Sequence, residues 1–228
     1  MSGQDYRIGL IHATMNSVQP ILEAFQAHAP QVTLVNFMDE SLIFELNETG
    51  IVTKGMARRL LHLVEKAEMS GVDGILLTCS SFTPVIVENS HLFEVPVLSA
   101  DFSMLEKAVE TGTRIGVIAT VEAAGPTTTK LLERISLERQ KELSIQTVII
   151  PEAFQALQNG DRTKHDALIH RKVKELTTEC DVILFAQFSM ARALVTLDMM
   201  TINRPILTSP EISVKSIITE IAKREANL

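Results

Sequence analysis

The 228-residue sequence contains no tryptophan and one tyrosine, and it carries a formal net charge of -7. Nucleic acids need a basic surface for their phosphates, and single strands need aromatic side chains on which bases stack. The sequence therefore predicts no nucleic-acid partner. It also lacks an uninterrupted apolar run of the roughly 18 residues that a membrane-spanning helix needs. We therefore expect no membrane partner.

Cysteine is scarce as well, because Cys79 and Cys180 are the only two. One directly follows an apolar segment and the other directly precedes one, so they do not suggest the framework of a disulfide-bonded secreted domain. Residues 1–6 are polar and lead straight into an apolar segment, which is unlike a signal peptide. These features favour a cytoplasmic protein.

Motifs for cofactors are missing too. No glycine-rich dinucleotide fingerprint follows the first apolar segment, and no residues show the spacing of metal ligands. His165 and His170, for example, are five residues apart, which places them on different faces of a helix. We therefore expect neither an organic cofactor nor a metal ion.

What the sequence does contain is a regular alternation of apolar and amphipathic segments. Helical spacing falls between most of the apolar segments, for example at residues 51–70 and 101–110. Such alternation indicates an α/β fold with mainly parallel sheets covered by helices. Strands are predicted at residues 7–12, 32–37, 74–78, 95–99, 114–120, 144–150, 181–186 and 204–208.

Three strand segments recur in the second half of the chain. The pairs are 7–11 with 114–118, 73–77 with 181–185, and 95–99 with 204–208, at offsets of 107, 108 and 109. Parallel strands resemble one another, but three similar segments in the same order at nearly constant spacing indicate a duplication.

The duplication predicts two pseudosymmetric lobes, each with a four-stranded sheet. Residues 1–99 with 209–228 would form the first lobe and residues 100–208 the second. We expect a cleft between the lobes, with ligands bound at the carboxyl ends of the strands.

The side chains that follow the third predicted strand are the most informative. Cys79 is followed by Ser80 and Ser81 and then by the start of a predicted helix. A helix N-terminus favours a thiolate, and the N–H groups and hydroxyls of the serines can hold a carboxylate. The structural alternative is a buried, inert cysteine. Cys180 precedes its strand and is predicted to be structural.

These residues resemble the cofactor-independent Asp/Glu/hydantoin racemase superfamily, which includes hydantoin racemases, maleate isomerases and arylmalonate decarboxylases. The resemblance rests on Thr78-Cys79-Ser80-Ser81, which is similar to the first cysteine motif, on Val95-Pro96-Val97, on the Ala119-Thr120 turn and on the duplication. It implies a small carboxylate-bearing substrate and a possible homodimer. In such racemases two cysteines move the α-proton on opposite faces of the substrate.

The second cysteine motif of that superfamily is altered here. An offset of 108 from Cys79 leads to Gln187. A glutamine amide forms hydrogen bonds but does not act as an acid or a base. A symmetric mechanism with two thiols is therefore unsupported.

Several chemistries stay open. In a racemase or isomerase, Cys79 is the base on one face and His12, at the end of the first strand, is the acid on the other. Alternatively, His12 satisfies backbone groups. In a decarboxylase, one thiol protonates an enediolate held by Gln187 and Ser189. Cys79 could also add covalently to an unsaturated or carbonyl carbon.

A non-catalytic protein that binds a small carboxylate is an alternative of another class. Hydroxyls and amides that follow the strands suit a carboxylate, although the same residue types cap helices. The sequence thus predicts Cys79, Gln187 and His12 as catalytic candidates. The substrate-binding candidates are Thr14, Asn16, Ser80, Ser81, Thr120 and Ser189.

Overall fold

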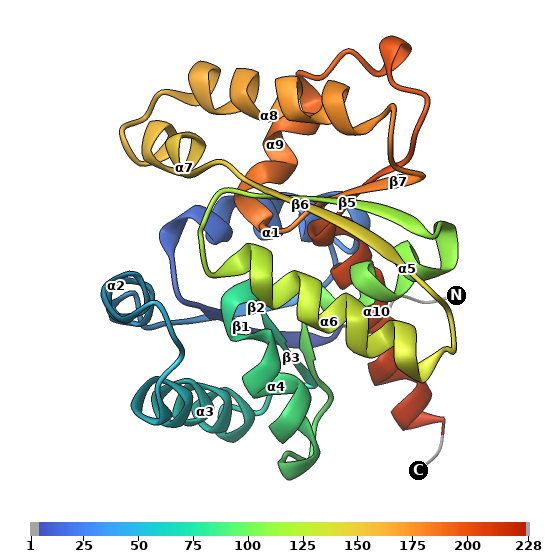
Figure 1. The fold of residues 1–228 in the computed structure, drawn as a ribbon. Helices are drawn as coiled ribbons and strands as arrows, with labels where there is room; N and C mark the ends of the chain where they lie inside the picture. Colours follow the sequence, from blue (N-terminus) through green and yellow to red (C-terminus); the bar gives the residue numbers. More distant parts are fainter. Residues whose placement is uncertain (1–4, 227–228) are drawn as a thin grey trace. The chain divides into compact units, whose positions relative to one another are not determined.

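The computed structural model describes residues 5–226. They form two compact units: the first runs as far as Ala100 and resumes at Pro210, and the second is Asp101–Ser209. Each unit contains a four-stranded sheet with parallel strand pairs. Helices cover both sheets (Figure 1), which confirms the predicted α/β class. No helix in this part of the chain is long and apolar enough to cross a membrane.

The sheet of the first unit has the strand order β2-β1-β3-β4. Its strands are β1 Arg7–His12, β2 Thr33–Met38, β3 Gly74–Leu77 and β4 Val97–Ser99. The helices are α1 Val18–His28, α2 Ser41–Thr49, α3 Lys54–Met69, α4 Thr83–Asn89 and α10 Ser209–Glu225, and the 3-10 turns are η1 Met15–Ser17, η2 Ser80–Phe82 and η3 Ser90–Leu92.

The sheet of the second unit has the order β6-β5-β7-β8, which is the order of the first sheet with every number raised by four. Its strands are β5 Arg114–Ala119, β6 Ser144–Ile149, β7 Val182–Phe185 and β8 Ile206–Thr208. The helices are α5 Phe102–Thr111, α6 Ala124–Glu138, α7 Pro151–Gln158, α8 Arg162–Leu176 and α9 Ala191–Val195, and the 3-10 turns are η4 Phe188–Met190 and η5 Met199–Thr201.

Glycine in the first strand of each sheet lets a helix approach closely. A Cβ on Gly9 would lie 3.0 Å from Ala67 of α3, and a Cβ on Gly116 would lie 3.2 Å from Leu176 of α8. Contacts this short displace a neighbour, so a larger residue would separate helix and sheet. Two of the recurring sequence segments thus carry the same packing constraint.

Helices α6 and α8 cover opposite faces of the second sheet (Figure 1). On β6, Ile149 faces α6, because its side chain lies 3.0 Å from a Cβ placed on Gly125. Val148 points to the other face, where it packs against a buried cluster that includes Ile169 of α8 and Phe185 of β7. Both faces of this sheet are therefore packed, which explains its nearly continuous apolar strands.

Two predicted strands begin later than expected. The segments predicted at 95–99 and 204–208 are strands only over Val97–Ser99 and Ile206–Thr208. Each predicted segment contains a proline, which has no N–H to donate to a neighbouring strand. The carbonyls of Pro96 and Pro205 still accept hydrogen bonds from the adjacent strands. The other strands lie within one residue of the predicted bounds.

The helix predicted at 51–70 begins three residues later, at Lys54 of α3. The Thr53 hydroxyl accepts a hydrogen bond from the backbone N–H of Met56 at 3.2 Å, which caps the first turn. At the other end Gly71 has φ +72°, a left-handed conformation that stops the helix. The cap therefore sets where this helix starts. The helix predicted at 101–110 is α5, shifted by one residue.

Candidate functional site

In the first unit, the turns that follow β1 and β3 lie side by side because these strands are neighbours in the sheet. Ser17 ends the turn after β1, and Thr78 opens the turn after β3. Their hydroxyl oxygens lie 2.9 Å apart. Cys79 follows Thr78 directly, so the thiol belongs to the same edge of the sheet as the polar turn after β1.

Cys79 occupies the position immediately before η2, which continues into α4. Cys79 is 8% exposed, so little of its surface is accessible to solvent. Ser80 and Ser81 are also buried, within the first turn after the cysteine. The N–H groups at the start of such a turn carry partial positive charge, which favours a thiolate and attracts carboxylates. The surroundings of Cys79 are therefore suited to the role predicted for it.

His12 is completely buried at the end of β1. Its Nε2 donates a hydrogen bond to Asn36 Oδ1 at 2.9 Å, and its Nδ1 lies 2.8 Å from the Thr78 hydroxyl and 3.3 Å from the Ser17 hydroxyl. Burial lowers the pKa of His12, and the hydrogen bond to Asn36 opposes that effect. The imidazole is therefore neutral at physiological pH. The side chains of Asn36, Thr78 and Ser17 hold it in place.

The turn after β1 also holds a donor that has no partner. The Thr14 hydroxyl accepts a hydrogen bond from the backbone N–H of Asn16 at 3.3 Å, which orders the turn. The Asn16 side-chain nitrogen, Nδ2, is buried and makes no hydrogen bond within the described residues. A buried amide without a partner is costly, and a ligand oxygen would satisfy it.

In the second unit, Gln187 follows β7 as Cys79 follows β3. Its Oε1 accepts hydrogen bonds from the backbone N–H of Thr120 at 2.6 Å and from the Thr120 hydroxyl at 3.1 Å. Ser189 lies in η4, two residues later, and is 8% exposed. Because the carbonyl end of the amide is occupied, the NH₂ group is the part of Gln187 that can donate to a ligand.

Sequence analysis missed Asn36, the partner of the buried histidine. Asn36 is a polar residue in an otherwise apolar segment of β2, and that interruption was the available signal. The register pairs it with Leu10 rather than with His12, so the contact depends on side-chain reach. Spacing in the sequence therefore does not reveal it.

Cys180 lies in the core of the second unit and is 2% exposed. Burial raises the pKa of its thiol, which disfavours the reactive thiolate. This environment agrees with the predicted structural role.

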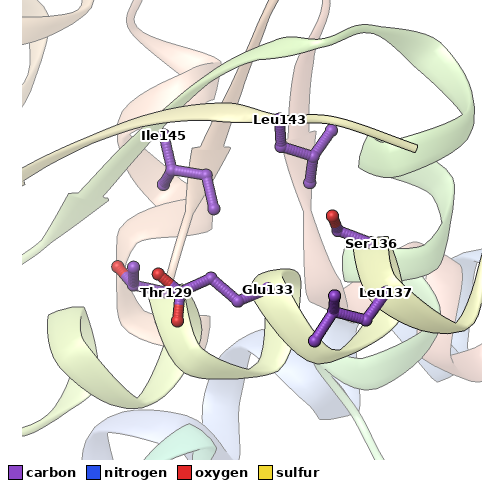
Figure 2. Close-up of a pocket in the computed structure, with 6 residues that line it drawn as sticks. All are labelled: Thr129, Glu133, Ser136, Leu137, Leu143 and Ile145. Carbon is purple, nitrogen blue, oxygen red and sulfur yellow. The ribbon is translucent and has the colours of Figure 1, made fainter. Parts of the chain in front are cut away.

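A pocket of about 410 Å³ lies between α6 and the start of β6 (Figure 2). Figure 2 shows Leu143, directly before β6, and Ile145 of β6 pointing toward Glu133 and Leu137 of α6. None of the predicted site residues lines it. Within residues 5–226, no three His, Cys, Asp or Glu side chains are grouped so as to hold a metal ion.

Lowering the pH from about 7.5 to about 5.5 is expected to destabilise both units. His12 in the first and His165 in the second are fully buried, and burial lowers both pKa values. The unfolded chain, with histidine pKa values of about 6.5, then binds more protons than the folded one, so stability decreases as the pH falls through that value.

Each histidine would contribute a slope of up to about 1.4 kcal/mol per pH unit. Urea unfolding measured at a series of pH values tests this, with His165→Leu as a variant that removes one contribution. A free energy of unfolding that stays constant over this pH range would contradict the prediction.

Comparison with known proteins identifies the family of this chain. The Asp/Glu/hydantoin racemase family model matches residues 8–217. No curated protein sequence matches the chain significantly.

Several solved structures share the fold at low sequence identity. An aspartate racemase homologue from Pyrococcus horikoshii has a TM-score of 0.71 and 15% identity, covering 95% of this chain and 99% of its own. Allantoin racemase from Klebsiella pneumoniae has a TM-score of 0.70 and 16% identity, covering 96% of this chain and 89% of its own. A glutamate racemase from Bacillus anthracis has a TM-score of 0.72 and 16% identity, covering 97% of this chain and 83% of its own. Since the family match spans most of the sequence, this chain belongs to the Asp/Glu/hydantoin racemase family.

Proposed function

We propose that this protein is a cofactor-independent enzyme of the racemase or isomerase type. It acts on the carbon next to the carboxylate of a small amino acid or related acid, with Cys79 as the base. The observation that carries the proposal is the placement of Cys79 at the start of a helical turn, beside a polar turn with an unpaired buried donor. A thiolate, a carboxylate site and restricted access to water are what α-proton removal needs.

In the proposed reaction the Cys79 thiolate takes the α-proton and becomes a thiol, and the electron pair of the C–H bond moves into the carboxylate to form an enediolate. The N–H groups and hydroxyls of Ser80 and Ser81, together with the Asn16 amide, would hold the carboxylate oxygens. Thr14 would act indirectly, by ordering the turn that presents Asn16. Return of a proton from the thiol to the same face restores the base and gives exchange with retention. Inversion requires that a donor other than Gln187 protonate the opposite face of the enediolate.

Gln187 would contribute as a hydrogen-bond donor only. Its Oε1 is occupied by Thr120, so its NH₂ group can stabilise an oxygen that gains negative charge. It cannot deliver a proton to the opposite face of the substrate. Ser189 is a second candidate donor after the same strand. We infer that the chain's own acid–base chemistry is concentrated at Cys79.

This asymmetry also favours a second candidate, a decarboxylase of the same family. There, a substrate with two carboxylates on one carbon loses one of them as carbon dioxide, and the electron pair of the broken C–C bond moves into the other carboxylate to form the enediolate. The Cys79 thiol then protonates that carbon on one face and becomes a thiolate. The specific observation in its favour is the same occupied Gln187 carbonyl, which leaves one proton-transferring group of the predicted pair. Covalent addition by Cys79 and ligand binding without chemistry are the remaining alternatives.

Incubation in heavy water with a panel of small amino acids and α-substituted acids tests the proposal. Deuterium at the α-carbon, read by proton NMR, supports Cys79 chemistry, and chiral chromatography shows whether the configuration inverts. Release of carbon dioxide would establish the decarboxylase instead. Saturable binding of the same acids without exchange or product would sink the enzyme proposal and leave a binding protein.

Gln187→Cys is expected to add inversion to an enzyme that exchanges without it. The substitution places a second thiol where the family's second cysteine motif has one, so protons could be exchanged on both faces. Chiral analysis of substrate recovered from heavy water would show the opposite enantiomer carrying deuterium. Gln187→Ser is the control, because it removes the amide without supplying a thiol. Equal inversion in both variants would contradict the role assigned to this position.

A further inference from the structure

The polar network beneath Cys79 determines the orientation of a single hydroxyl group. Asn36 Oδ1 can only accept, so the Nε2 of His12 must carry the proton in their 2.9 Å hydrogen bond. In the neutral imidazole the Nδ1 atom is then an acceptor. Its shortest contact is the Thr78 hydroxyl at 2.8 Å. That hydroxyl also lies 3.1 Å from the Ile11 carbonyl, but the shorter contact directs its single proton to Nδ1.

Thr78 also forms hydrogen bonds with β1 and with the turn that follows it. Its backbone N–H donates to the Ile11 carbonyl at 3.0 Å, and its hydroxyl oxygen lies 2.9 Å from that of Ser17. Thr78 is 2% exposed, so water does not replace these partners. The side chain is held from three directions, and the next residue along the chain is Cys79.

We propose that His12 is a positioning residue that orders the Cys79 turn through the Thr78 hydroxyl. This inference rests on the proposed function only in taking Cys79 as the reactive group. His12 itself is fully buried and has both ring nitrogens engaged, so it acts through Thr78 and does not contact substrate. Asn36 completes the device by fixing the tautomer, which second-sphere hydrogen bonds commonly do for histidine.

Two substitutions of His12 separate the proposed role from packing. Asparagine places its amide near the position of Nδ1, where its oxygen can accept from Thr78. Glutamine places its amide near the position of Nε2, where it can bond Asn36 but not Thr78. If the contact to Thr78 is what matters, His12→Asn should retain the property that His12→Gln loses. If His12 only filled space, His12→Asn would have no reason to retain the property better than His12→Gln.

The measured property is the pH dependence of Cys79 alkylation by iodoacetamide, read by mass spectrometry of the Cys79 peptide. The plateau rate reports access to the thiol, whereas the midpoint reports how well its surroundings stabilise the thiolate. We expect His12→Gln and Thr78→Val to raise the midpoint by about one pH unit, the effect of one lost hydrogen bond. His12→Asn and Thr78→Ser should stay close to the wild-type midpoint.

Asn36→Ala extends the test to a position that tolerates change, because Asn36 is an exposed residue of an edge strand. It removes the acceptor that fixes the tautomer, so the midpoint should also rise. Thr147→Val is the matched control. It breaks a hydroxyl pair of similar length, 2.7 Å to Thr129, in the second unit, and should leave the midpoint unchanged.

Equal midpoints in wild type, His12→Gln and Asn36→Ala would overturn the inference. So would an equal shift in His12→Asn and His12→Gln. A wild-type midpoint near 8.5, the value of an ordinary thiol, would count against the proposed function and not against the positioning role. The two proposals therefore fail in different measurements.

Discussion

Cys79→Ala is expected to lower the rate of α-proton exchange by about 10²- to 10⁴-fold, the usual contribution of a positioned acid or base. The variant should keep the hydrogen bonds among His12, Ser17 and Thr78, because none of them involves the sulfur. Exchange is measured as deuterium incorporation by NMR on the substrate that the wild-type protein labels fastest. Circular dichroism and urea unfolding show that the fold persists.

Two further variants make this result specific. Cys79→Ser keeps the size and polarity but offers a hydroxyl, which does not ionise near neutral pH, so it should lose activity almost as completely. Cys180→Ala is the control for the other thiol, which is buried in the core of the second unit, and should exchange at the wild-type rate if it folds. Full exchange by Cys79→Ala would rule out Cys79 as the base.

Asp166→Ala is expected to reduce the free energy of unfolding by about 3 kcal/mol, because it leaves the buried His165 and the partly buried Arg192 without their acceptor. Asp166 Oδ1 lies 2.7 Å from His165 Nδ1 and also accepts from the Arg192 guanidinium, and Oδ2 accepts from the Thr196 hydroxyl at 3.3 Å. The estimate takes the lower end of the usual range, because the Arg192 side chain is 30% exposed. These contacts join α8 to α9, which follows the turn that carries Gln187.

Urea unfolding of wild type and variant at neutral pH gives this difference directly. The control is Glu138→Ala, which removes the exposed partner of Arg134 on α6 in the same unit. An exposed ion pair of this kind contributes at most about 0.5 kcal/mol. If both variants were equally stable, the Asp166 cluster would not hold α9 in place.

Much of the fold could be predicted because its signals are local. Apolar strands alternate with helices that end at recognisable residues, such as Gly71 after α3. The errors came from residues whose effect depends on a partner. Pro96 and Pro205 continue the apolar pattern of a strand, but without an N–H they cannot join the ladder as donors. The apolar residues before Thr53 likewise suggested an earlier start for α3, but the Thr53 cap makes the helix begin at Lys54.

The candidate site was predictable in part. Cys79, Ser80 and Ser81 are consecutive, so one strand end and one helix start place them together. Gln187 was found because the chain repeats itself. The environment of His12 could not be found this way, because it depends on Asn36 and Thr78, which lie 24 and 66 residues further along the chain.

The sequence by itself determined the α/β alternation, the recurrence of three strand segments and the choice of Gln187 as the position that corresponds to Cys79, since each is a matter of residue type and spacing. Only the tertiary structure decided which polar groups lose water. His12 becomes fully buried and neutral, the Gln187 carbonyl is bound by Thr120, and Asn16 keeps an unpaired donor. The physical reason is that hydration and hydrogen-bond partners depend on chain segments brought together by folding, and a side chain's chemistry follows from those surroundings.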